Sequence, residues 1–123
     1  MSDQCFAGSA EKIGAKSTPT QLAEHLYQDL FSGPPCTREQ QWANISDAVN
    51  TFSHLPRAQA EAVNKAYEER THGVSFLLET QADPRMVSVQ RDRIAGALGL
   101  KGEAAVTSVL NKEAEDWKRT HKN

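Results

Sequence analysis

Helix-boundary signals recur along this 123-residue chain at intervals too short for long helices or for a sheet. Thr18-Pro19 places a capping residue before a proline at the first helical position, a preferred start of a helix. Gly33-Pro34-Pro35 then ends that helix, because glycine adopts the left-handed cap conformation and proline cannot continue a helix. Similar signals divide the remaining chain. The sequence therefore predicts an all-α protein, a compact bundle of about six short helices.

Between these signals, apolar residues recur at spacings of three and four, the pattern of amphipathic helices. Leu22, Leu26 and Leu30 form such a face on the first helix. The second helix starts at Thr37, because Thr37 and Gln40 fit a capping box. We expect a third helix from Pro56 to about Thr71 and a short fourth helix after the cap Ser75. A fifth helix should run from Asp83-Pro84 to Gly99, with Val87, Ile94, Ala95 and Leu98 facing inward. A sixth should run from about Gly102 to Lys118.

Length and composition predict one helical domain over residues 19–118, behind a disordered tail at residues 1–18 and before a frayed end at 119–123. The formal net charge of -2 gives no global field that would favour nucleic acid or an anionic membrane. The start of the chain lacks the pattern of a secretory signal peptide, and no apolar run reaches membrane-spanning length. We therefore expect a cytoplasmic protein, or one exported by a dedicated secretion system that reads the first residues.

Cys5 and Cys36 are the two cysteines of the sequence. We interpret them as two free thiols, one in the tail and one in the first interhelical loop. If they were oxidised, the disulfide would attach the tail to that loop and restrict the unfolded chain. Two widely spaced cysteines do not form a zinc signature.

Four histidines are dispersed along the chain, at His25, His54, His72 and His121. No two of them have the i,i+4 spacing of a helical metal site, and a metal site needs three or more converging ligands. We expect these histidines to lie at the surface or at helix ends. The sequence thus predicts no metal site and no cofactor.

Carboxylates cluster at Glu68-Glu69 and at Glu113, Glu115 and Asp116, where general acid or base chemistry is conceivable. Lysine and arginine residues lie at helical spacings from both clusters, so we interpret them as solvated, ion-paired faces. Nothing indicates a pocket around them, and the chain contains neither a glycine-rich phosphate loop nor a serine elbow. We therefore expect that the protein is not an enzyme.

Residues 22–98 resemble a single annexin-type repeat. The resemblance rests on the helix of Leu22, Leu26 and Leu30, the glycine-containing loop 32–39, and the segments 66–73 and 94–98. It implies five helices, with the third across the others, and calcium-dependent membrane association. On the calcium loop, Gly33 and Thr37 match the edges and Asp83 falls near the family's acidic ligand, whereas Pro35-Cys36 replaces the second glycine and makes the loop degenerate.

Residues 94–111 are similar to the helix-turn-helix of lac-repressor-type DNA-binding domains. Ala95 and Gly99 have the separation that lets two helices approach closely, although the turn is one residue longer at Lys101-Gly102. The resemblance implies phosphate contacts from the preceding helix and base or backbone contacts from the following one. The residues concerned are Arg85, Arg91, Arg93, Thr107, Ser108 and Asn111. Acidic residues on the second helix oppose binding to the DNA backbone.

A non-enzymatic interaction module that binds another protein, as an effector, inhibitor or adaptor, is the function that the sequence favours. The reason is a well-capped helical scaffold without catalytic residues. Aromatic side chains near helix ends are the candidate anchors for a partner, because aromatic residues dominate binding energy in interfaces. They are Tyr27, Phe31, Trp42 and Trp117. DNA binding through residues 94–111 is the alternative, and annexin-like membrane association is the second alternative.

Overall fold

The computed structural model describes residues 17–31 and 37–121, and these residues form six α-helices and no strand, which confirms the all-α prediction. The helices are α1 (Pro19–Leu30), α2 (Arg38–Ser53), α3 (Arg57–Thr71), α4 (Phe76–Ala82), α5 (Ser88–Ala97) and α6 (Glu103–Thr120). Residues 1–16 of the tail predicted at 1–18, which include Cys5, lie outside the described residues, as do the loop residues Gly33, Pro34, Pro35 and Cys36. None of the six helices has both the length and the apolar composition to cross a membrane.

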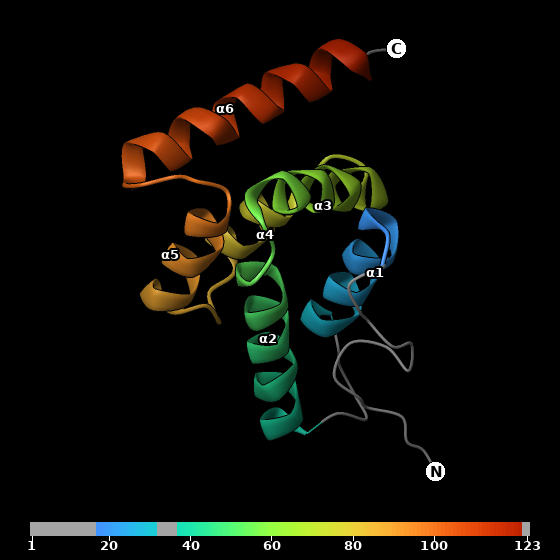
Figure 1. Cartoon of the computed structure of the whole chain (residues 1–123), viewed down its shortest axis with the longest axis vertical. Helices are drawn as coiled ribbons and strands as arrows, with labels where there is room; N and C mark the ends of the chain where they lie inside the picture. Colours follow the sequence, from blue (N-terminus) through green and yellow to red (C-terminus); the bar gives the residue numbers. More distant parts are fainter. Residues whose placement is uncertain (1–16, 32–36, 122–123) are drawn as a thin grey trace.

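The core lies among the first five helices. α1 packs against α2 and α3, α2 packs against α5, and the short α4 lies between α3 and α5 (Figure 1). Its centre is aromatic: the rings of Phe52 and Phe76 are 4.7 Å apart, those of Tyr67 and Phe76 are 5.2 Å apart, and all three side chains are fully buried. The apolar face predicted for α1, formed by Leu22, Leu26 and Leu30, is part of the remaining core.

The capping box predicted at Thr37 is present, and Thr18, predicted as a helix cap, also forms a capping box. The Thr18 hydroxyl accepts a hydrogen bond of 3.1 Å from the backbone N–H of Gln21, whose side chain accepts one of 2.9 Å from the Thr18 N–H. Thr37 and Gln40 repeat this arrangement at 3.1 and 3.0 Å at the start of α2. Each box satisfies two of the backbone N–H groups that the first turn of a helix leaves without partners. Ser75 caps α4 as expected.

The start of the fifth helix differs from the prediction. Asp83-Pro84 does not open α5, which begins at Ser88 after the cap residue Val87. The reason is that the Asp83 carboxylate is bound by the backbone N–H and guanidinium of Arg85, so it stabilises a tight turn at the end of α4. Val87 was expected to face inward, but it lies in this connection and is 53% exposed.

α6 runs along one end of the molecule, across α3 and α5 (Figure 1). None of its residues is buried, although Val106, Val109 and Leu110 are partly buried against the core. The helix continues to Thr120, two residues beyond the expected end. This arrangement leaves room between α6 and the bundle.

Candidate functional site

A cavity of about 270 Å³ lies between α3 and α6. α3 contributes one wall, α6 the other, and the turn between α5 and α6 the floor. The lining residues are Arg57, Glu61, Asn64, Lys65, Glu68, Leu98, Leu100, Val109, Glu113 and Asp116. This pocket was not predicted from the sequence, because its two walls are far apart along the chain.

Glu113 holds the middle of α6 against the bundle. Its carboxylate accepts a hydrogen bond of 2.8 Å from the Asn64 side-chain amide and one of 2.6 Å from the Ser75 hydroxyl. The Asn64 carbonyl oxygen in turn accepts a hydrogen bond of 2.8 Å from the backbone N–H of Leu77. Glu113 was expected on a solvated, ion-paired face, and this expectation is wrong: the side chain is half-buried and organises a polar network.

Trp117 fixes the C-terminal half of α6. Its indole lies so close to Gly73 that a Cβ atom added there would be 3.2 Å from the ring. Gly73 has a φ of 127°, and the preceding His72 adopts the left-handed conformation that caps α3. Gly73 was predicted as the glycine that ends α3. In the structure the left-handed cap is His72, and Gly73 instead allows the close approach of Trp117.

The electrostatics of the cavity are unequal. Four carboxylates and two basic side chains line the cavity. One of the two basic side chains, Arg57, is already paired with Glu61 at 3.0 Å. Burial raises the pKa of Glu68, and the neighbouring charge of Glu113 raises it further. Leu98 and Val109 give the cavity an apolar surface. An apolar cavity with excess negative charge suits a cation on an aliphatic stem.

The four predicted aromatic anchors are not gathered into one site. Phe31 is 52% and Trp42 is 48% exposed, so both are available to a partner. Tyr27 is half-buried between the ring of Phe31, at 4.7 Å, and the guanidinium of Arg70, whose carbon lies 4.1 Å from the Tyr27 ring centre. Trp117 packs on Gly73 and stacks on His121, so its main contacts are within the chain.

The three arginines assigned to DNA contacts all make hydrogen bonds within the chain. Arg85 binds Asp83 and the carbonyl oxygen of Leu30, at 2.8 Å, which joins the end of α1 to the turn after α4. Arg91 donates to the Asp83 carbonyl oxygen at 2.8 Å.

Arg93 donates to Asn50 and Ser53 on α2, at 3.0 and 2.9 Å. Thr107, Ser108 and Asn111 lie together on the exposed face of α6, beside Glu103. Each of the three arginines thus donates a hydrogen bond to a group of the bundle, and the three polar residues of α6 are exposed.

The candidate calcium ligands have other roles where they are described. Gly33 lies outside the described residues. The Thr37 hydroxyl caps α2. The Asp83 carboxylate is paired with Arg85 at 2.7 Å. Burial by itself raises the pKa of Asp83, but the hydrogen bonds from Arg85 outweigh this effect and hold the pKa below its usual value.

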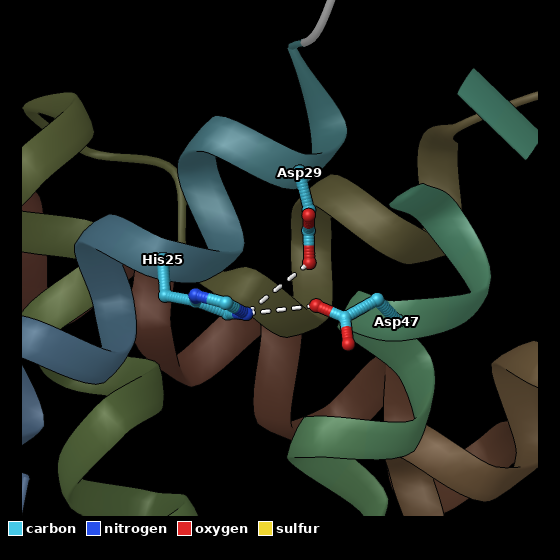
Figure 2. Close-up of side chains that lie close together, drawn as sticks. All are labelled: His25, Asp29 and Asp47. Carbon is cyan, nitrogen blue, oxygen red and sulfur yellow. Dashed lines mark hydrogen bonds and ion pairs between the residues drawn. The ribbon is translucent and has the colours of Figure 1, made fainter. Parts of the chain in front are cut away.

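A second polar cluster was missed. His25 is only 8% exposed, so its expected surface or capping role is wrong, whereas His54, His72 and His121 are exposed helix-end caps as expected. The His25 Nε2 atom lies 2.7 Å from Asp47 Oδ2 on α2 and 3.6 Å from Asp29 Oδ2 on α1 (Figure 2). The i,i+4 spacing of His25 and Asp29 was the signal that analysis of histidine pairs alone overlooked.

His25, Asp29 and Asp47 bring three potential metal-binding side chains together, an arrangement that the sequence analysis did not predict. Burial by itself raises the pKa of Asp47, but hydrogen bonds with Asp29 and His25 outweigh it and hold that pKa below its usual value. One potential ligand atom from each of the three residues lies within 4.8 Å of the other two, in a cluster whose His25 and Asp29 side chains are buried.

Comparison with known proteins gave no match to any family model, curated protein or solved structure. The annexin-like and helix-turn-helix resemblances therefore stay predictions from the sequence.

Proposed function

We propose that this chain is a non-enzymatic helical interaction module that binds another protein, with the cytoplasm as its proposed compartment. The supporting observation is the cavity between α3 and α6, which is lined by the carboxylates of Glu68 and Glu113 and by the apolar side chains of Leu98 and Val109. In this proposal, the occupant is a lysine or arginine side chain of the partner, presented next to an apolar residue.

The size of the cavity supports a single side chain as the occupant. At about 270 Å³ it is below the roughly 300–1,000 Å³ of pockets that hold drug-sized ligands or cofactors. A basic side chain would bury its aliphatic stem against Leu98 and Val109 and place its charge between the carboxylates of Glu68 and Glu113. The positive charge of this side chain would also reduce the repulsion between the two carboxylates, which favours a basic side chain as the occupant.

Selection from a random peptide library tests this proposal. We expect the selected peptides to share a lysine or arginine beside an apolar residue. Their affinity should fall roughly tenfold in Glu68→Gln, equivalent to about 1.4 kcal/mol. Glu69→Gln is the matched control, because Glu69 is the exposed neighbour on the same helix. Selected peptides without a basic residue, or with equal affinity for both variants, would contradict the proposal.

DNA binding through residues 94–111 and annexin-like membrane association remain the two alternative functions. A gel shift at low salt tests the first, because non-specific affinity for DNA is greatest there. Co-sedimentation with anionic vesicles, with and without calcium, tests the second. We expect no binding in either experiment.

A further inference from the structure

We propose that His25, Asp29 and Asp47 form a binding site for one divalent transition-metal ion, of which zinc is the best fit, and that this ion links α1 to α2. One potential ligand atom from each residue lies within 4.8 Å of the other two. His25 and Asp29 come from successive turns of α1, and Asp47 faces them from α2 (Figure 2). This site is separate from the cavity between α3 and α6.

The donor set selects the class of metal. Carboxylates alone favour magnesium or calcium, whereas an imidazole with carboxylates suits zinc and its neighbours in the first transition series. With zinc–ligand bonds of roughly 2.0–2.2 Å, two ligand atoms on a tetrahedral ion lie about 3.3 Å apart. The His25–Asp29 separation of 3.6 Å is close to this value, and the His25–Asp47 separation of 2.7 Å requires Asp47 to move by less than an ångström.

Burial and charge also favour a cation. The Asp29 side chain is 0% exposed and the His25 side chain 10% exposed, so their polar atoms have lost contact with bulk water. As metal ligands, the two carboxylates supply a double negative charge, which one divalent ion neutralises. The Asp47 side chain is 36% exposed and provides the route by which an ion enters.

The imidazole of His25 is oriented for this role. Its Nε2 atom points at both carboxylates, as Figure 2 shows. Its Nδ1 atom is buried and has no hydrogen-bond partner among the described residues. Because no protein acceptor or donor fixes the state of Nδ1, the ring proton can lie there and leave the Nε2 lone pair to the metal. Three protein ligands leave a fourth position of a tetrahedral ion for water.

Titration of the chelator-treated chain with zinc chloride, followed by calorimetry, tests the site. The protein should contain Cys5→Ser and Cys36→Ser, so that thiolates are excluded as ligands. We expect one zinc ion per chain and a melting temperature raised by roughly 10 °C when free zinc is about 100-fold above Kd. Cobalt chloride should give visible absorption bands typical of nitrogen and oxygen ligands.

Asp47→Asn is the decisive variant, because its half-exposed side chain can change without loss of the fold. We expect it to weaken zinc binding at least tenfold, and Asp29→Asn and His25→Gln to do the same if they remain folded. His54→Gln and Asp92→Asn alter exposed groups outside the cluster and should bind zinc like the parent. Absence of stoichiometric binding, or binding that Asp47→Asn leaves unchanged, would overturn the proposal.

Discussion

Glu113 on α6 accepts a hydrogen bond of 2.8 Å from the amide of Asn64 on α3, 49 positions earlier in the sequence. Asn64 is almost fully buried, and its amide is held at the other end by the backbone of Leu77. Since α6 buries none of its residues fully, a few such contacts fix it against the bundle and form one wall of the cavity. The shape of the proposed binding site therefore depends on this pair.

Glu113→Ala should weaken the attachment of α6. The substitution leaves the Asn64 amide and the Ser75 hydroxyl without their acceptor, and an unsatisfied buried polar group costs about 1–3 kcal/mol. Urea denaturation should show this loss in the free energy of unfolding, and amide hydrogen exchange should accelerate in α6. Glu115→Ala on the exposed face is the control. Equal stabilities of the two variants would contradict the role of Glu113.

Two glycines should respond to alanine in opposite directions. Gly73→Ala places a Cβ 3.2 Å from the Trp117 ring at a φ of 127°, so we expect destabilisation by about 1–3 kcal/mol. Gly96→Ala adds a methyl group within α5 where nothing lies within 4 Å, so we expect stabilisation by about 0.5–1 kcal/mol. Thermal unfolding of both variants provides the comparison. Destabilisation by Gly96→Ala would show that α5 is packed differently.

The first capping box should contribute measurably to stability. Thr18→Ala removes the hydroxyl that accepts from Gln21, and loss of such a cap costs about 1 kcal/mol. Thr20→Ala, two positions later on the exposed first turn of α1, removes a threonine that makes no capping bond and should change stability little. Urea denaturation midpoints of the two variants decide the matter, and a similar loss in both would count against the box.

Asp83→Asn should destabilise the protein at neutral pH but not in acid. The pKa of Asp83 is lowered from 3.8 by its hydrogen bonds to Arg85, despite the opposing effect of burial. Its ionised form therefore stabilises the fold above the unfolded pKa of about 3.9, and this contribution is lost as pH falls through the lower folded pKa. We expect a loss of about 1.5–3 kcal/mol at pH 7, typical of hydrogen bonds to a charged group.

The measurement is urea denaturation of the parent and of Asp83→Asn from pH 7 to below pH 4. Asp92→Asn removes an exposed carboxylate from the same region and serves as control. A difference between parent and Asp83→Asn that persists unchanged below pH 3 would mean that the substitution acts through packing rather than through charge.

Glu68→Gln should have the opposite sign. Burial and Glu113 raise the pKa of Glu68 above 4.5, so its ionised form opposes folding at neutral pH. This penalty is fully present above the folded pKa and disappears as pH falls below the unfolded pKa. The variant should unfold at a higher temperature than the parent at pH 7 and at the same temperature near pH 4. A less stable Glu68→Gln at pH 7 would contradict the excess negative charge of the cavity.

Local signals in the sequence predicted the helices well. The boxes of Thr18 and Thr37 involve residues three apart, so sequence alone determines them. Asp83-Pro84 failed because the Asp83 side chain has two possible uses, a helix cap or a turn, and the arginine two positions later selects the turn. The αL cap at His72 was missed for a related reason, since the adjacent glycine is the residue that usually adopts this conformation.

The polar sites were not predictable because their partners are distant. The i,i+4 spacing of His25 and Asp29 indicates that these two residues of the buried cluster lie on one face of α1. Asp47 lies beside them only because α1 packs on α2. Glu113 has no local signal, since its sequence neighbours are exposed and its partners, Asn64 and Ser75, are distant in the sequence. Side-chain placement across helices depends on their packing, which periodicity does not specify.

Amide chemical-shift mapping by NMR tests the proposed binding site most directly. A peptide selected for its basic residue is titrated into the labelled full chain, and the perturbed amides are located. We expect them to cluster at Asn64, Glu68, Leu98, Val109 and Glu113, and to require roughly tenfold more peptide in the folded variant Glu68→Gln. Perturbations centred instead on Phe31 and Trp42, or on Thr107, Ser108 and Asn111, would contradict binding in the cavity between α3 and α6.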